Sequence, residues 1–308
     1  MAIRPDLPPV VHHPAYSADM PANHRFPMGK YAALAQVLID EELVPETGFF
    51  RPEPASFAAL AAVHDPVYVR HVFDLTVPRE VERRIGLPIT RSVAERARAA
   101  TGGTILAARL ALEHRLACNT AGGSHHAGPA GGAGFCTFND VAVAARILLG
   151  EGAVRQILVV DCDVHQGDGT ARIFEREPRV FTFSMQGEKN YPVRRAVSDL
   201  DIELPDGTTD GPYLGRLAEA LPGVVDRVRP DLIFYIAGVD PHADDRLGRL
   251  SLSDEGLAAR DAYVLATCLS AAPVVGVIGG GYDRNIDALA KRHATLHRAA
   301  AKAWRTLG

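Results

Sequence analysis

The chain has 308 residues, of which 47% are hydrophobic and 23% are charged, and its formal net charge is −4. This composition is typical of a soluble globular protein, and the length permits one large α/β domain or two small domains. The near balance of 33 basic and 37 acidic residues, without any block of lysine and arginine, argues against a nucleic-acid-binding protein.

No stretch reaches 18 uninterrupted apolar residues, so we expect no membrane-spanning helix. No long apolar segment lies near the amino terminus, and the last expected helix ends close to the carboxyl terminus, so we expect neither a signal peptide nor a regulatory tail. The four cysteines form no CxxC pair, which argues against a zinc ribbon or a disulfide framework and favours a cytoplasmic protein.

Strand-like apolar runs alternate with helical patterns along the chain. In chain order, the patterns predict a strand at 10–13, helices at 29–43, 56–63 and 92–113, a strand at 116–121, a helix at 139–149, a strand at 157–160, a helix at 169–176, a strand at 180–184, a helix at 213–227, a strand at 232–237, a helix at 253–270, a strand at 274–278 and a helix at 285–304. This alternation predicts a three-layer α/β/α fold, in which helices cover both faces of a mainly parallel sheet. Without any linker or repeat, residues 1–308 are expected to form a single domain.

The least regular segment is 77–89, which contains Pro78, Gly86 and Pro88. Proline and glycine interrupt helical and strand patterns. We therefore expect a surface loop here, which borders a substrate entrance.

The strongest chemical signal follows the third expected strand. Asp161, Asp163 and His165 alternate along an extended chain, so their side chains share one face. Asp240 comes first after a later apolar strand, and ligands of parallel sheets bind beyond the carboxyl ends of the strands. We expect Asp163, His165 and Asp240 to hold a divalent cation such as zinc, with Asp161 one step deeper and orienting a histidine. The alternative is a strand end with solvated polar residues.

Two adjacent histidines, His125 and His126, lie in a glycine-rich segment. On their own, they indicate a loop with one buried, hydrogen-bonded ring more often than a catalytic site. The glycines allow a ligand to approach the backbone closely, and one histidine could accept a proton from water while the other stays charged. Each would need a carboxylate partner, for which Asp161 and Asp168 are available.

Three glycines precede Tyr282. They resemble a phosphate-binding loop, but the lysine and hydroxyl residue of that motif are missing. The alternative is that the glycines let the phenol reach into the site, where a neutral donor suits a developing oxyanion. Phe135 and Tyr191 are the nearest aromatic residues; such residues usually belong to the core, but here they could wall a narrow apolar channel.

These motifs, taken together and in this order, resemble the zinc-dependent histone deacetylases of the arginase/deacetylase superfamily. The resemblance covers about 24–283 and is carried by Gly123-Ser124-His125-His126-Ala127, Gly134-Phe135-Cys136-Thr137-Phe138-Asn139-Asp140, Asp161 to Gly169, Gly238-Val239-Asp240 and Gly279-Gly280-Gly281-Tyr282. The details are most similar to the class IV branch and its bacterial relatives, on the evidence of His165-Gln166-Gly167, Thr101-Gly102-Gly103-Thr104 and Gly187 to Pro192. The resemblance implies the arginase/deacetylase fold.

The resemblance also assigns roles to the residues. It implies Zn²⁺ bound by Asp163, His165 and Asp240, a site that Fe²⁺ could also occupy. It implies that His126, paired with Asp168, is the general base, and that His125, paired with Asp161, is its electrostatic partner. Tyr282 would hold the oxyanion.

For the substrate, the resemblance implies that Gly134 accepts an N–H group, that Phe135 and Tyr191 flank the acyl-lysine stem and that Leu247 contributes to the same surface. Arg25 aligns with an arginine of the inner acetate pocket of the family. One departure is that 77–89 contains no identifiable counterpart of the acidic residue with which many members grip the substrate backbone.

Two structural potassium sites are also implied. The first would use Ser184 together with carbonyl groups of Asp161, Asp163, His165 and Met185. The second would lie near Phe174, Val180 and Tyr213.

The sequence therefore predicts a metal-dependent amidohydrolase that removes acetyl or other acyl groups from lysine side chains of proteins. The alternative substrates are acetylpolyamines or other small acetylated amines. A ureohydrolase with two Mn²⁺ ions would need a further acid where His126 stands. A catalytically dead acyl-lysine binder would need neither Tyr282 nor the two histidines.

Overall fold

The computed structural model describes residues 6–21, 24–44 and 48–307. Within them, seven strands form one sheet in the order β1-β2-β7-β6-β3-β4-β5, and every pairing is parallel. The strands are β1 (Val10–Val11), β2 (Leu116–Asn119), β3 (Ile157–Asp161), β4 (Val180–Gly187), β5 (Leu200–Leu204), β6 (Leu232–Ile236) and β7 (Val274–Val277). The predicted α/β fold with a parallel sheet is confirmed.

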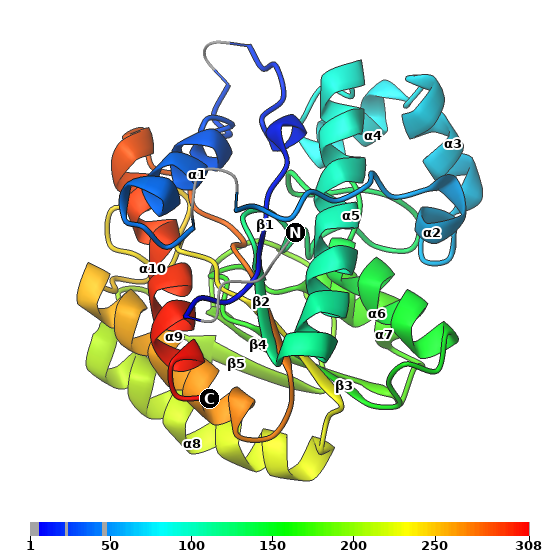
Figure 1. Cartoon of the computed structure of the whole chain (residues 1–308). Coiled ribbons are helices and arrows are strands. Elements are labelled where there is room, and N and C mark those ends of the chain that lie inside the picture. Colours follow the sequence, from blue (N-terminus) through cyan, green and yellow to red (C-terminus); the bar gives the residue numbers. More distant parts are fainter. Residues whose placement is uncertain (1–5, 22–23, 45–47, 308) are drawn as a thin grey trace.

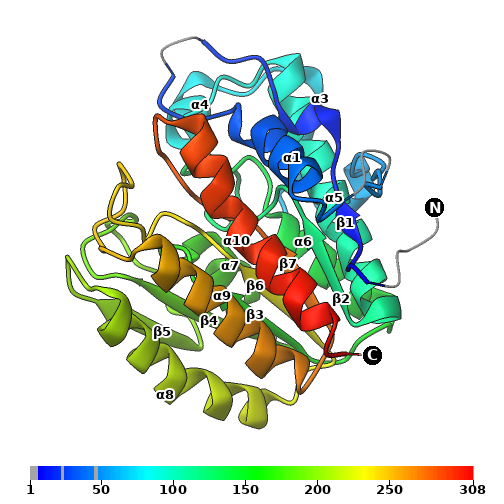
Figure 2. The same cartoon turned by 60° about the vertical axis from the view of Figure 1, so that its left-hand side comes forward.

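Helices cover both faces of the sheet (Figure 1). They are η1 (Pro14–Tyr16), α1 (Lys30–Asp40), α2 (Phe57–Ala61), α3 (Pro66–Asp74), α4 (Arg79–Ile85), α5 (Arg91–His114), α6 (Asp140–Gly150), α7 (Asp168–Phe174), α8 (Asp210–Val228), α9 (Asp254–Leu269) and α10 (Ile286–Trp304). Figure 2 shows α8, α9, α10 and α1 side by side across one face, whereas α5 and α6 pack together on the other.

The central strands are buried on both faces, which explains their continuous apolar sequences. In β3, Leu158 and Val160 join the core beneath α8–α10, whereas Ile157 and Val159 join a second core against α5 and α6. Alternate strand residues point to opposite faces, so one strand supplies both cores.

The segment 77–89, predicted to be a loop, contains the short helix α4 at Arg79–Ile85. Pro78 stands at the N-cap of α4, and Gly86 ends the helix in the left-handed conformation with φ of 77°. Proline before a helix and glycine after it are the usual signals of helix ends, so the residues taken as breakers mark the boundaries of α4. The helix α3 and the edge strand β5 were also missed.

Other boundaries follow the capping residues. Ser56 accepts a hydrogen bond from the Ala59 amide at the start of α2, and Asn139 accepts one from the Ala142 amide at the start of α6. Such caps satisfy amide groups that have no partner within the helix. None of the helices in the described part of the chain is long and apolar enough to cross a membrane.

Candidate active site

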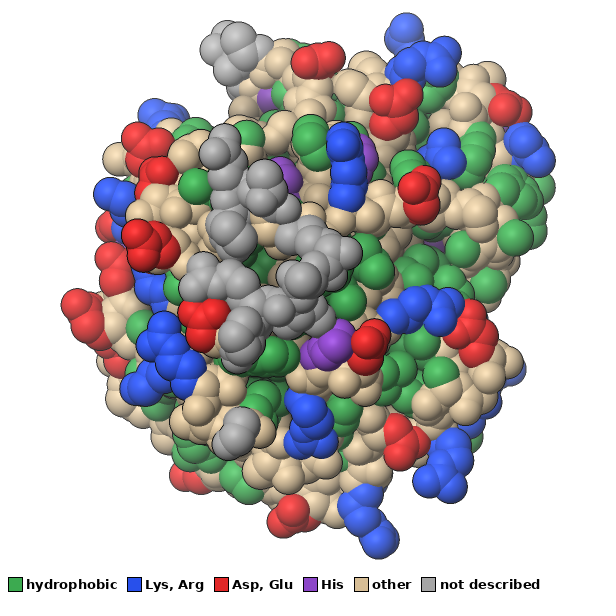
Figure 3. Space-filling view, viewed as in Figure 1, with side chains coloured by type: hydrophobic (Ala, Val, Ile, Leu, Met, Phe, Trp, Pro, Cys, Tyr) green, Lys and Arg blue, Asp and Glu red, His purple; other side chains and the backbone are tan. Residues whose placement is uncertain are grey.

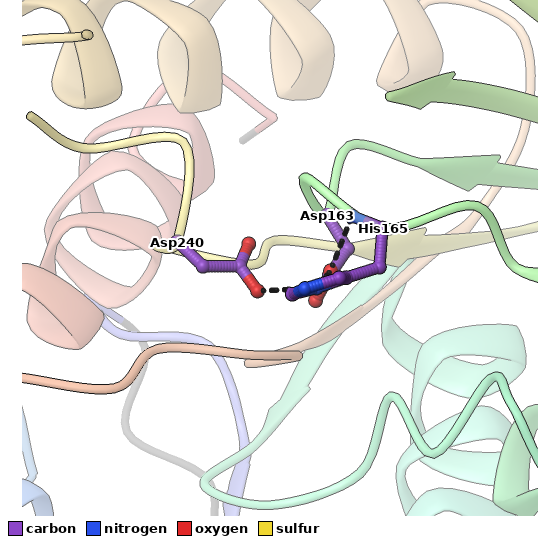
Figure 4. Close-up of side chains that lie close together, drawn as sticks. All are labelled: Asp163, His165 and Asp240. Carbon is purple, nitrogen blue, oxygen red and sulfur yellow. Dashed lines mark hydrogen bonds and ion pairs between the residues drawn. The ribbon is translucent and has the colours of Figure 1, made fainter. Parts of the chain in front are cut away.

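Asp163, His165 and Asp240 meet at the carboxyl ends of two neighbouring strands. Their ligand-type atoms all lie within 4.8 Å of one another, and all three side chains are buried (Figure 4). His165 Nδ1 lies 3.0 Å from Asp163 Oδ1 and 3.1 Å from Asp240 Oδ2. They converge because β3 and β6 pair in parallel with Asp161 opposite Ile236.

This cluster fits a divalent cation. Two carboxylates and one imidazole are ligands that zinc and ferrous iron accept, and three protein ligands leave further positions open. Burial, together with the charge of Asp163, raises the pKa of Asp240 to about 7. A bound cation would relieve this repulsion between the two carboxylates.

Backbone groups hold the two carboxylates in place. The Gly280 amide donates to Asp163 Oδ2 at 2.7 Å, and the Val164 amide donates to Asp240 Oδ1 at 2.9 Å. A Cβ atom at Gly280 would lie 2.1 Å from Asp240 Oδ2. Glycine is therefore required where the segment after β7 passes the cluster.

Each of the two adjacent histidines has a carboxylate partner. His125 Nδ1 lies 2.6 Å from Asp161 Oδ2, and His126 Nδ1 lies 2.8 Å from Asp168 Oδ1. Burial opposes charge on His125, but Asp161 and Asp163 outweigh it and raise its pKa to about 9. Burial and the charge of His125 lower the pKa of His126 to about 4, despite Asp168. One ring is thus charged and the other neutral near pH 7.

Asp140 holds the turn that carries these histidines. Its carboxylate accepts hydrogen bonds from the amides of Gly123 and Ser124 at 3.2 and 2.8 Å, and from Thr104 Oγ1 at 2.6 Å. Asp140 also lies in the first turn of α6. Its buried carboxylate therefore joins α5, the turn and α6.

Two of the predicted catalytic residues, His126 and Tyr282, share one cavity of about 570 Å³ with all the predicted substrate residues. From the predicted set, the cavity is lined by His126, Gly134, Phe135, His165, Tyr191, Leu247 and Tyr282. The ring centroid of Tyr191 lies 4.8 Å from that of His126, and the centroid of Tyr282 lies 6.1 Å from that of His165. The Tyr282 amide donates to Asp245 Oδ2 at 2.7 Å, which holds the backbone from which the phenol extends.

Two cations of the interior were missed. Lys30 and Arg96 are buried and line an inner space of about 30 Å³ that reaches His125, Asp163 and Tyr282. Lys30 Nζ donates to the carbonyl of Gly279 at 3.3 Å. Arg96 lies between Val93 and Ala100 on the buried face of α5. Charged residues are seldom fully buried, so an arginine on this apolar helix face could have indicated a functional role from the sequence.

The prediction for Arg25 is wrong. This arginine is exposed at the outer cavity, where its guanidinium lies 5.1 Å from the centroid of the Phe135 ring, and it does not line the inner space. Lys30, five residues later, faces that space instead. The sequence alignment with the family is loose in this loop, so it could not decide whether Arg25 or Lys30 faces the inner space.

The residues predicted for the second potassium site do not come together in the structure, so that prediction is also wrong. Val180 pairs with Ile157 at the start of β3, whereas Tyr213 lies beside Cys162 and Arg260, beyond the opposite end of that strand. Tyr213 therefore cannot join Val180 around one ion. At the first predicted site, Ser184 pairs with Asp161, and its hydroxyl accepts from the Gly167 amide at 3.4 Å. That site stays a prediction.

Comparison with known proteins gives one consistent family. The histone deacetylase domain family matches residues 24–299. An uncharacterized protein of Picosynechococcus is 50% identical over 95% of this chain and 98% of its own length, and histone deacetylase 2 of Arabidopsis thaliana is 32% identical over 85% and 70%. A probable deacetylase of Archaeoglobus fulgidus is 33% identical over 75% and 68%. Among solved structures, an acetylpolyamine aminohydrolase from Burkholderia pseudomallei has a TM-score of 0.79 at 20% identity, over 95% of this chain and 98% of that one, which shows a shared fold.

Proposed function

The chain belongs to the histone deacetylase family, and we propose that it is a metal-dependent amidohydrolase that removes acetyl or other acyl groups from lysine side chains of proteins. The observation that carries the proposal is the convergence of three kinds of group around the cavity and the adjoining inner space. These are the Asp163, His165 and Asp240 cluster, the two histidine–aspartate pairs and the Tyr282 phenol.

Asp163, His165 and Asp240 would hold the metal, zinc or ferrous iron. When bound, the ion would supply Lewis acidity to the amide carbonyl and to water. His126, neutral and oriented through Nδ1 by Asp168, would accept the proton of the attacking water and pass it to the leaving amine.

Two further groups would stabilise the negative charge that develops on the amide oxygen. His125 contributes a positive charge held by Asp161, and the Tyr282 hydroxyl donates a hydrogen bond. Such preorganised donors are usually the largest single contribution to catalysis of this kind. The Gly134 carbonyl would accept the amide N–H of the substrate and so fix its orientation.

The shape of the cavity favours an acyl group on a straight alkyl stem. Phe135 and Tyr191 stand at its walls, and Leu247 contributes further apolar surface. Burial of each methylene of a lysine stem would contribute about 0.8 kcal/mol. An acylated small amine, such as an acetylpolyamine, offers a similar stem and is the alternative substrate.

The experiment that tests this function is a substrate panel. Purified, metal-loaded protein should release acyl groups from fluorogenic acyl-lysine peptides, and acetylpolyamines should be run beside them. Turnover of acetylpolyamines alone would transfer the proposal to small amines. No turnover of any substrate, with metal content verified, would contradict an amidohydrolase.

Hydroxamates are expected to inhibit that activity competitively at micromolar concentration. They chelate an open metal site, and a linear alkyl chain would lie between Phe135 and Tyr191. The measurement is a dose–response curve beside the matching carboxamide, which lacks the chelating hydroxyl. Equal weakness of both compounds, with metal present, would contradict the predicted geometry.

A further inference from the structure

The mouth of the active-site cavity is lined by cations and by no carboxylate among the described residues. Five basic side chains contribute to the lining, together with the site residues already described: Arg25, Arg83, Arg84, Lys189 and Arg249. The chain as a whole has a net charge of −4, so this local excess of positive charge is not a consequence of composition. The face seen in Figure 3 has acidic and basic side chains intermixed instead.

Three of the five cations are not neutralised by neighbours. Lys189 and Arg249 share Asp206, with N–O distances of 3.9 and 3.2 Å. In contrast, no carboxylate in the described part of the chain lies within 4.0 Å of the side-chain nitrogens of Arg25, Arg83 or Arg84, and all three side chains are exposed. Their charge is therefore available to a ligand.

These arginines are attached directly to the wall of the cavity. The amides of Gly134 and Phe135 donate to the carbonyls of Arg84 and Ile85 at 3.1 and 2.6 Å, so the end of α4 is joined to the loop that carries Phe135. The Arg84 Nε group donates to the Gly132 carbonyl at 3.0 Å, which leaves both terminal nitrogens for other acceptors.

The arginines at the cavity mouth would contact the part of the substrate that carries the acylated lysine, and not the acyl group itself. An acyl group at the metal cluster would project toward the inner space, which holds only about 30 Å³. Arg25, Arg83 and Arg84 lie at the opposite, outer end of the stem, beside the aromatic wall. They would contact whatever flanks the acylated lysine.

We propose that the substrate presents its acyl-lysine within an acidic peptide segment, with aspartate or glutamate residues next to the lysine bound by Arg25, Arg83 and Arg84. This inference rests on the proposed function, because it names the class of protein substrate for the same site. Lysines in basic segments, and acetylpolyamines with further ammonium groups, meet like charge at the mouth and are selected against.

The test uses three peptides of equal length, in which one acetyl-lysine is flanked by glutamate, by glutamine or by lysine, with an acetylpolyamine as a fourth substrate. The glutamate peptide is expected to have a kcat/KM about tenfold above the glutamine peptide at low ionic strength, since three exposed ion pairs each contribute modestly. The lysine peptide and the acetylpolyamine should be the poorest. The preference should shrink as salt rises.

The double variant R25Q/R83Q should reduce the ratio between the glutamate and glutamine peptides towards unity. Arg84 is left in place because its Nε group supports Gly132. R216Q is the matched control, since Arg216 is an exposed arginine on α8 outside the cavity lining, and it should keep the wild-type ratio.

Equal turnover of the three peptides, or a preference for the lysine peptide or the acetylpolyamine, would overturn the inference. Binding of labelled peptides by fluorescence anisotropy is measured in parallel. If no peptide is hydrolysed, the proposed function fails, but the order of affinities still decides whether the mouth selects acidic segments.

Discussion

Replacing Tyr282 with phenylalanine is expected to lower kcat on the best acyl-lysine substrate by about 10²–10³, the usual effect of losing one oxyanion donor. Burial and the charges of Asp163 and Asp240 hold the pKa of Tyr282 well above its usual range, so the phenol stays a neutral donor. Its hydrogen bond would be stronger to the oxyanion than to the substrate carbonyl, so kcat should fall more than KM rises.

The control for this variant is Tyr263→Phe, which removes a phenol hydroxyl from α9, outside the lining of the active-site cavity. Both variants should keep the wild-type melting temperature and metal content, measured by thermal unfolding and elemental analysis. A Tyr282→Phe protein with near-normal kcat would show that Tyr282 only packs against Phe135, whose ring centroid lies 5.7 Å away.

Removing Asp240 is expected to abolish activity through loss of the metal. Substitution of residues that merely support metal ligands weakens binding by about 10–100-fold, so loss of a ligand itself should exceed about 100-fold. Asp240→Ala also leaves the Val164 amide without its acceptor, at a cost of about 1–3 kcal/mol, so Asp240→Asn is tested beside it as the variant that keeps an acceptor oxygen.

Metal content is measured by elemental analysis after dialysis, and folding is verified by circular dichroism. The matched control is Asp244→Ala, which removes an exposed carboxylate from the same loop together with its ion pairs to Arg292 and His242. We expect one metal ion per chain in the wild type and in the control. Full occupancy in both Asp240 variants would show that the ligand set is wrong, and two ions per chain would favour a binuclear hydrolase.

The sequence alone determined most of the elements and much of the candidate site. A period of two placed Asp161, Asp163 and His165 together at the end of β3, and the helices predicted at 56–63 and 139–149 begin at residues that cap α2 and α6 in the structure. These signals are local: they depend on strand geometry and on unpaired amides within a few residues. The pairing of His125 and His126 with carboxylates was predicted from the family motifs, and the structure contains both pairs.

Assignments without a strong local signal fared less well. The similarity to the class IV branch stays a prediction. Pro78 and Gly86 mark the two ends of the short helix α4, but in the sequence they were interpreted as signs of a loop. A helix of this length has too few turns to show a clear period, and packing beside the cavity mouth decides its existence.

Only the tertiary structure decided which distant side chains share a surface. Tyr213 and Val180 lie at opposite ends of β3, and the path of the chain before α1 turns Lys30 inward and leaves Arg25 at the mouth. The positive charge of the mouth comes from separate segments, including Arg83 and Lys189, that no spacing in the sequence connects. Local pattern determines period and caps, whereas the neighbours of a charge depend on the packing of segments far apart in the chain.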